Sequence, residues 1–231
     1  GQKKKRTAFA QSDTGKQIMT AMIDAVRRKE ASGMVERFSH HSFLTLRLCG
    51  NICCGCVIRD EYSQETVELP GDAVIVATGG MHGLFGNTTG SLSNTGEVTA
   101  ELFRLGVPLA NGEMIQYHPT TVKCGGKRML ISEAARGEGG RLFAMKDGKQ
   151  WYFMEEKYPE LGNLMPRDIT AREIWKVSHE SEVFLDMTEI SEEIISNKLS
   201  GLADDCMTYL HKDIRKEPVS VLPGIHYFMG G

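Results

Sequence analysis

Residues 73–77 (Ala-Val-Ile-Val-Ala) contain no polar side chain, and Thr78-Gly79-Gly80 follows them directly. A continuous apolar run of this length is typical of a strand buried on both faces, as parallel strands in α/β proteins are. The glycines leave the main chain accessible, so that a ligand can approach the peptide groups. The sequence therefore predicts a buried parallel strand that opens into a ligand-binding loop, and hence an α/β domain.

Periodic and alternating patterns predict the elements around this strand. Apolar residues recur at three- and four-residue steps over residues 16–29, behind the capping candidates Asp13 and Thr14 and before Gly33, which predicts an amphipathic helix. Short β-rich runs predict a small antiparallel sheet that leads into the apolar strand, over residues 43–48, 57–60, 66–69 and 73–76. Further along, we expect helices over residues 94–105, 168–178 and 191–199, and a strand over residues 183–185.

Four of the six cysteines lie within eight residues, at Cys49, Cys53, Cys54 and Cys56. Such a cluster suggests a zinc or iron-sulfur site. The flanking segments are strand-like, however, and alternate residues of a strand point to opposite faces, so four converging sulfurs are hard to achieve. Six cysteines are also too sparse for a disulfide scaffold. We therefore expect free, buried or half-buried thiols on a hairpin, with a metal site as the alternative.

Composition excludes several classes of partner. The formal charge of -3 and pI near 6.2 provide no basic excess for nucleic acid or an acidic membrane surface, and the basic run at residues 3–6 is expected to be a solvated edge. No apolar stretch approaches the roughly 20 residues of a membrane span, and no leading segment resembles a signal peptide. The sequence predicts a cytoplasmic protein without direct membrane insertion.

Four clusters place polar residues of catalytic type beside apolar residues or glycine: QYHPT (116–120), SEAARGEGG (132–140), PRD (166–168) and HYFMGG (226–231). Each cluster alone is weak evidence for a site, since a lone histidine, or an arginine next to an aspartate, more often has a structural role. Together they supply histidines, arginines, a hydroxyl and one carboxylate. The cations and the hydroxyl are suited to holding a small dicarboxylate. The carboxylate then needs another task, for which a proton carrier among the cations is the natural choice.

The order ATGG, NTTG, NTGE, QYHPT, SEAARGEGG, PRD and KEPVSVLPGIHYFMGG resembles the flavoprotein subunits of succinate dehydrogenase and fumarate reductase, from Asp13 onward. The resemblance implies a central piece of a two-domain enzyme that interconverts fumarate and succinate, with hydride transfer through flavin N5. It implies an α/β FAD-binding part, made of a parallel strand, an antiparallel sheet and helices, over residues 1–117 with 226–231 returning to it. An α+β capping domain would be inserted over residues 118–225.

The same resemblance assigns roles to individual residues. His118, Ser132 and His226 resemble the contacts to the substrate carboxylates. Arg167 matches the proton donor, and Glu133 with Arg136 matches the relay that reprotonates it. Because the pKa of arginine exceeds about 12, its role as an acid follows from the resemblance alone. The expected FAD contacts are Ala77, Thr78, Gly79, Gly80, Thr88, Thr89, Asn94, Thr95, Gly96 and Glu97.

Several features depart from the family pattern. Thr95-Gly96-Glu97-Val98 stands where the family has Thr-Gly-Asp-Gly, and Ser132-Glu133-Ala134 replaces Thr-Glu-Gly, a change that also resembles L-aspartate oxidase. The Gly-x-Gly-x-x-Gly fingerprint, the flavin-tethering histidine-glycine segment and a further substrate arginine beyond His226 do not occur in the sequence. We therefore expect the chain alone to bind FAD poorly.

Two alternatives stay open. One is an enzyme similar to L-aspartate oxidase on the same scaffold; the other is a non-catalytic module, including a metal-binding one built on the cysteine cluster. For the leading hypothesis, the resemblance implies FAD as cofactor, a small dicarboxylate as substrate and an iron-sulfur electron-transfer subunit as partner. A peripheral position at the cytoplasmic face of a membrane, through partner subunits, would follow from such an assembly.

Overall fold

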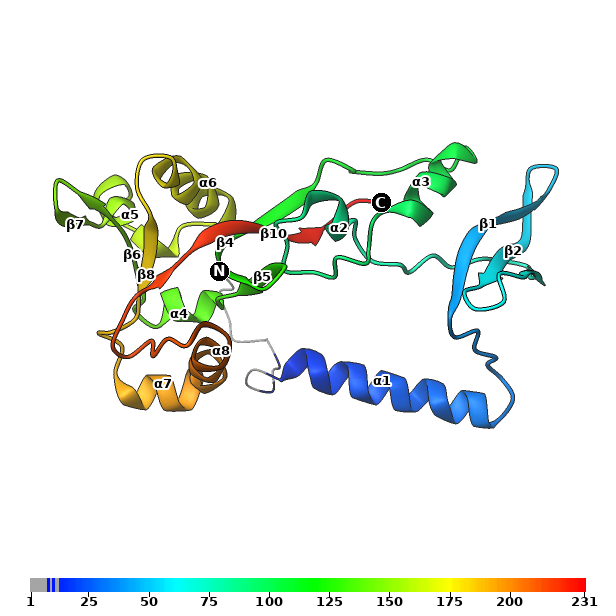
Figure 1. Cartoon of the computed structure of the whole chain (residues 1–231), viewed down its shortest axis with the longest axis horizontal. Coiled ribbons are helices and arrows are strands. Elements are labelled where there is room, and N and C mark those ends of the chain that lie inside the picture. The colour runs from blue at the N-terminus through cyan, green and yellow to red at the C-terminus, as the bar shows by residue number, and fades with distance from the viewer. Residues whose placement is uncertain (1–7, 9, 11–12) are drawn as a thin grey trace. The chain divides into compact units, whose positions relative to one another are not determined.

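The computed structural model describes Ala8, Ala10 and residues 13–231, which form two compact units that divide between Ala73 and Val74 (Figure 1). The basic run at residues 3–6 lies outside the described residues. Among those described, no helix is both long and apolar enough to cross a membrane.

The first unit contains a helix and a three-stranded sheet. Helix α1 (Thr14–Ala31) confirms the predicted amphipathic helix, and Gly33 follows its end with a φ of +73°. Asp13 is the residue before the helix, but its side chain makes no capping hydrogen bond. None of the helical residues is buried within the described part of the chain, and Met22 is 61% exposed. The apolar face of α1 therefore has no covering partner among the described residues.

The sheet of this unit is antiparallel, in the order β1-β2-β3, as the alternating runs predict. Its strands are β1 (His41–Cys49), β2 (Ile52–Asp60) and β3 (Thr66–Pro70). The hairpin between β1 and β2 carries the four clustered cysteines, of which Cys49 and Cys54 form a disulfide. The expectation of free thiols is therefore wrong for this pair, because the hairpin register brings residues five apart in sequence within bonding distance. Cys53 and Cys56 are free and half-buried, and no group of three or more potential ligands among the described residues is arranged to hold a metal.

The predicted strand over residues 73–76 is not formed. The chain from Ala73 to Gly80 is irregular, Ile75 is 92% exposed and Val76 is 45% exposed. An apolar run becomes a buried parallel strand only between neighbouring strands, and no described strand pairs with this one. Its composition matches the prediction, but its partners are not among the described residues.

The second unit is built around two sheets. The first has the order β10-β4-β5, all antiparallel, and consists of β4 (Ile115–Cys124), β5 (Lys127–Leu130) and β10 (Leu222–Phe228). Gly224 pairs with His118, so segments about a hundred residues apart lie side by side (Figure 1). The short α2 (His82–Phe85) and the predicted helix α3 (Glu97–Arg104) precede this sheet. Gly96 starts α3 in the left-handed region and Gly106 follows its end with a φ of +86°.

The second sheet has the order β7-β6-β8-β9. Its strands are β6 (Arg141–Lys146), β7 (Lys149–Trp151), β8 (Val183–Asp186) and β9 (Val219–Ser220). The helices that accompany it are α4 (Glu133–Gly137), α5 (Phe153–Lys157), the 3-10 turn η1 (Gly162–Leu164), α6 (Arg167–Ser178), α7 (Glu192–Lys198) and α8 (Ser200–Leu210). The predictions for α6, α7 and β8 are confirmed. Buried apolar residues between Val122 and Val221 form one core, with Ile131, Leu142 and Leu185 fully buried.

Candidate active site

Arg167 is the first residue of α6, and its guanidinium is held from two sides. Its Nε and Nη2 donate to Oε2 of Glu133 at 3.1 and 3.0 Å, and its Nη1 donates to Oε1 of Gln116 at 2.8 Å. All three donating nitrogens lie on the planar fork, so these contacts fix its orientation as well as its position. Since the three residues come from α6, α4 and β4, the fold assembles this group from segments 34 and 51 residues away from Arg167.

Arg136 lies behind Glu133 and is almost fully buried. Its Nη2 donates to Oε1 of Glu133 at 3.2 Å, and its Nη1 donates to the main-chain oxygen of Asn163 at 2.6 Å. The Asn163 side chain is itself fixed, since it donates to Glu155 and accepts from the main chain of Leu142. Glu133 thus joins the two arginines through its two carboxylate oxygens, in the order that the resemblance implies for a proton relay.

The protonation of this relay follows from burial and charge. Burial of Glu133 would raise its pKa, but the hydrogen bond and charge of Arg167, together with the charge of Arg136, outweigh it and hold the pKa below its usual value. Burial lowers the pKa of Arg136, an effect that Glu133 opposes and Arg167 reinforces. Near neutral pH, Glu133 is therefore a carboxylate between two guanidinium groups, able to receive a proton from one side and pass it to the other.

Two histidines lie beside the relay. His118 on β4 and His226 on β10 meet edge to face, with ring centroids 5.4 Å apart. Burial, followed by the positive charge of Arg167, lowers the pKa of both rings, and that of His118 falls to about 4. Both imidazoles are thus neutral at pH 7, and each can present an N–H to an anion without the desolvation cost of a buried cation.

Ser132 caps α4 and supplies the predicted hydroxyl at the same end of the site. Its oxygen accepts from the main-chain nitrogen of Ala134 at 3.2 Å, which leaves the hydroxyl hydrogen free to point elsewhere. Ser132 is exposed and directly precedes Glu133. In the described part of the chain no hydrogen bond joins Ser132 to either histidine, so its role toward a substrate stays a prediction.

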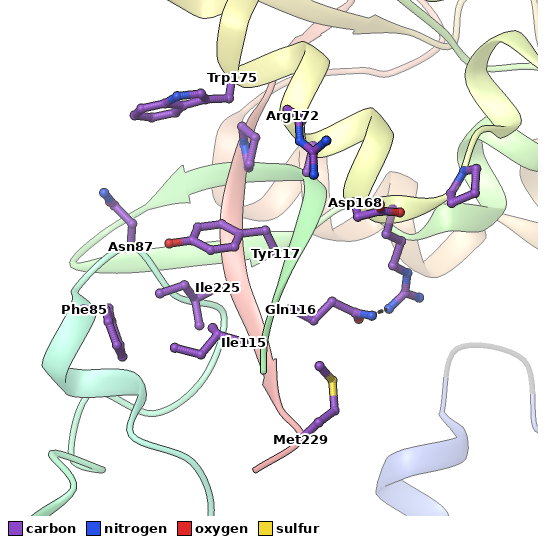
Figure 2. A pocket seen from close by; sticks show the side chains of 14 residues that line it. Phe85, Asn87, Ile115, Gln116, Tyr117, Asp168, Arg172, Trp175, Ile225 and Met229 are labelled. Carbon is purple, nitrogen blue, oxygen red and sulfur yellow. Dashed lines mark hydrogen bonds between the residues drawn. The ribbon is translucent and has the colours of Figure 1, made fainter. Parts of the chain in front are cut away.

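A cavity of about 870 Å³ adjoins part of this cluster: Gln116 and Arg167 line it, whereas the two histidines, Ser132 and Glu133 do not. Figure 2 shows the rings of Phe85, Tyr117 and Trp175 along the apolar part of the cavity. The polar side chain of Gln116 also lines it. Arg167 also lines the cavity, so the group at the start of α6 faces a space large enough for a ligand.

Sequence reasoning missed the role of Gln116. The available signal was its position two residues before His118, because alternate residues share a face if the segment is a strand, as β4 is. Asn163, which holds Arg136, carries no such signal: its contact depends on the fold of η1 against α4.

The predicted cofactor residues are brought together in part. Thr78, Gly79, Gly80, Asn94, Thr95, Gly96 and Glu97 line one small concavity of about 110 Å³ before α3. Gly79 has a φ of +77°, and a side chain at Gly80 would collide with the ring of Phe228. Glycine is therefore required at both positions, and the main chain stays accessible at the first helical turn, where backbone N–H groups favour anions.

Ala77, Thr88 and Thr89 do not line this concavity. Thr88 is fully buried, and its hydroxyl donates to the main-chain oxygen of Ile225, accepts from Gly90 and contacts Nδ1 of His82. The Thr89 hydroxyl contacts His226. Both threonines are thus engaged with other protein groups, and their contact with FAD stays a prediction.

Comparison with known proteins places this geometry in a family. The model of the FAD binding domain family matches residues 1–231. This chain belongs to that family. It is 40% identical to the succinate dehydrogenase flavoprotein subunit of Bacillus subtilis (strain 168), over 98% of this chain and 40% of the relative. It is also 30% identical to the L-aspartate oxidase of Clostridium perfringens (strain 13 / Type A), over 98% of this chain and 49% of the relative.

Solved structures agree. A variant of the E. coli quinol fumarate reductase superposes with a TM-score of 0.82 at 28% identity, over 98% of this chain and 41% of that chain. The chain is thus a member of the succinate dehydrogenase and fumarate reductase flavoprotein family of FAD-dependent oxidoreductases, as its motifs indicate. It spans about two fifths of the length of its first relatives.

FAD is the cofactor of this family, and the concavity at Thr78–Gly80 fits part of it. Its glycines suit the approach of a flavin edge to the main chain, while Glu97 places a carboxylate at the first turn of α3 in the same concavity, which disfavours a phosphate there. At about 110 Å³ it is smaller than the 300–1,000 Å³ typical of whole-ligand sites. The described residues therefore provide one portion of a cofactor site.

Proposed function

We propose that the protein containing this chain interconverts fumarate and succinate, and that this chain supplies most of the dicarboxylate site and its proton relay. The observation that carries the proposal is the Arg167 guanidinium, fixed by Glu133 and Gln116 beside a large cavity, with Arg136 buried behind Glu133. Such a chain of charge-assisted hydrogen bonds is a route for a proton, and it ends at a group facing a ligand space.

The roles of the residues follow from this arrangement. Neutral His118 and His226, with Ser132, donate hydrogen bonds to the substrate carboxylates. Arg167 delivers a proton to the substrate carbon in the reductive direction, and Glu133 returns one to it from Arg136. FAD, held in part at Thr78–Gly80 and Asn94–Glu97, supplies or accepts the hydride when bound. The same residues serve the oxidative direction, because each proton step is reversible.

An arginine acid needs a reason, given its high pKa. Two features of this site support it. The guanidinium is held by three of its five N–H groups, so its orientation is fixed and one of the two remaining N–H groups can be aimed at one carbon atom. Glu133, in direct contact with both arginines, can accept a proton from Arg136 and pass it to Arg167 to replace the one lost, which shortens the lifetime of the neutral guanidine.

A related function is the oxidation of L-aspartate, since an L-aspartate oxidase is among the relatives. Its substrate carries an ammonium group, which needs an acceptor. Glu133, the carboxylate in contact with Arg167, already accepts from arginines through both of its oxygens, and Asp168 is the acidic side chain that lines the cavity. Arg136, Arg167 and Arg172 outnumber these two carboxylates, so the charge balance favours a substrate with two carboxylates and no cation.

We also propose that residues 118–225 form a capping domain and that residues 1–117 with 226–231 form part of the FAD-binding domain. The support is the position of the core, whose buried members all lie between Val122 and Val221. An iron-sulfur subunit is the proposed electron-transfer partner, and the first relative is itself named as a subunit. A cytoplasmic or peripheral position on the cytoplasmic face of a membrane would suit such an assembly.

The test uses the full-length flavoprotein that contains this chain, loaded with FAD. We expect it to reduce fumarate with a reduced viologen donor and to be inhibited competitively by a three-carbon dicarboxylate. L-aspartate should be oxidised at least about a hundredfold more slowly, since a misplaced buried charge costs several kcal/mol. Faster oxidation of L-aspartate than of succinate would overturn the assignment and favour the related function.

A further inference from the structure

Thr89 connects the loop after α2 to the candidate substrate site. Its hydroxyl oxygen lies 2.7 Å from Nδ1 of His226, a short distance for a hydrogen bond between a hydroxyl and an imidazole nitrogen. The hydroxyl has one hydrogen, so it either donates to this nitrogen or accepts from it. The choice decides which nitrogen of neutral His226 carries the proton.

The main-chain oxygen of Ile225 resolves the choice. It accepts from the Thr89 nitrogen at 3.0 Å, and the Thr88 hydroxyl, which also lies 2.6 Å from Nδ1 of His82, is a second neighbour at 3.1 Å. The Thr89 hydroxyl is a third and more distant neighbour of this oxygen, at 3.4 Å. The hydroxyl hydrogen is better used on His226 Nδ1, which is closer and has no competing donor among the described contacts.

We propose that Thr89 is a positioning residue that holds His226 in the tautomer with the proton on Nε2. The effect of this tautomer on substrate binding rests on the proposed function, whereas the tautomer itself can be tested without it. Donation from Thr89 to Nδ1 leaves Nε2–H as a donor on the other side of the ring, which is what a carboxylate oxygen requires. The opposite tautomer would present a lone pair to an anion and repel it.

The surroundings of His226 keep the ring neutral, so that its tautomer matters. Burial, the charge of Arg167 and the neighbouring His82 lower the pKa of His226. His118 packs edge to face against it, with its own pKa lowered to about 4. A protonated ring would donate from both nitrogens and make Thr89 irrelevant, so neutrality is a condition of the proposal.

The first experiment measures the tautomer itself, in the full 231-residue chain. The two ring nitrogens of His226, labelled with ¹⁵N, are observed by NMR at pH 7.5 in the wild type, Thr89→Val, Thr89→Ser and Thr121→Val. We expect the wild type and Thr89→Ser to show Nδ1 unprotonated and Nε2 protonated. Thr89→Val, which has the same shape without the hydroxyl, should lose this preference and show averaging of the two nitrogens.

Thr121→Val is the matched control. Its hydroxyl donates to the main-chain oxygen of Leu222 at 2.7 Å, so it ties β4 to the same strand that carries His226. The control should leave the His226 nitrogens unchanged. A wild type with the proton on Nδ1, an unchanged pattern in Thr89→Val, or an equal change in Thr121→Val would each overturn the proposal.

The second experiment measures the consequence in the full-length, FAD-loaded protein. Thr89→Val should raise the KM for fumarate about tenfold, with kcat within about twofold, because a ground-state donor is misplaced while the proton relay is intact. Thr89→Ser should restore the KM. An unchanged KM in Thr89→Val would overturn the positioning role. If the wild type turns over no dicarboxylate, the proposed function fails while the NMR result still decides the tautomer.

Discussion

The proposed substrate side and the proposed flavin side of the site are built in different ways. On the substrate side, each functional group is tied to another: Arg167 to Glu133 and Gln116, and Arg136 to Glu133 and the main chain at Asn163. On the flavin side, the residues from Ala73 to Gly80 are irregular, and Ile75 is 92% exposed. The proposed substrate side is thus preorganised by contacts within this chain, whereas the proposed cofactor side presents main chain and apolar surface that no described residue covers.

The largest expected effect is on the free energy of unfolding, measured for one residue from each side. Leu185→Ala removes a fully buried side chain on β8 and should lower the free energy of unfolding by about 2–5 kcal/mol. Ile75→Ala, on the flavin side, should change it by less than about 0.5 kcal/mol, because the side chain is already in water. Urea denaturation of the 231-residue chain measures both. Equal losses would mean that Ile75 is buried in solution and that the contrast is wrong.

The second prediction concerns catalysis on the substrate side. Arg167→Lys in the full-length protein should lower kcat for fumarate reduction on the order of a hundredfold or more, with dicarboxylate affinity largely retained. Lysine keeps the charge but not the planar fork that Glu133 and Gln116 hold. Steady-state kinetics with reduced viologen measures this. The control is Arg215→Lys, because Arg215 forms an ion pair with Glu192 at the surface. Near-normal turnover in the Arg167 variant would mean that Arg167 has a structural role.

Much of this contrast follows from how far each feature depends on distant residues. Helix α1 and helix α6 were predictable because their apolar spacing is local. The site residues were predictable because each lies in a short motif. The strand over residues 73–76 was predicted from its composition but is not formed. A parallel strand needs neighbouring strands, and composition does not show whether they are present.

Side-chain contacts between distant segments were also beyond the sequence. Gln116 meets Arg167 across 51 residues, and Asn163 meets Arg136 across 27. The Cys49–Cys54 disulfide depends on the register of one hairpin, which turn geometry sets. Motifs thus marked the candidate site residues, while the contacts that orient them came only from the fold.

A third prediction separates the relay from its donor. Glu133→Gln should lower kcat roughly fiftyfold, because an amide of the same shape cannot return a proton to Arg167. The matched control is Glu138→Gln in the same motif, whose carboxylate pairs with Lys198 at the surface. Equal kinetic losses in both variants would show that the effect comes from the fold of this segment and not from the relay.

Glu133→Gln should also change how the free energy of unfolding depends on pH. The folded-state pKa of Glu133 lies below its usual value of 4.5, so the carboxylate stabilises the fold at pH values above about 4.5. That contribution is lost as the pH falls through the lower, folded-state pKa. The difference in the free energy of unfolding between wild type and Glu133→Gln should therefore be constant from pH 6 to 7.5 and shrink below about pH 4.5. Urea denaturation at several pH values measures it, and a difference that grows on acidification would contradict the ion-pair geometry.

The smallest expected effect lies where the two sides meet. His226 belongs to β10, but its Nδ1 contacts Thr89 in the loop after α2, so both sides determine its position. His226→Ala should raise the KM for fumarate about tenfold and change kcat by no more than about threefold, because a binding donor is lost and the relay through Arg167 and Glu133 is not. His179→Ala, an exposed ring that contacts the main chain of Trp175, is the control and should change neither constant. A large fall in kcat with an unchanged KM would assign His226 to proton transfer, and the division between binding histidines and a proton-carrying arginine relay would then have to be abandoned.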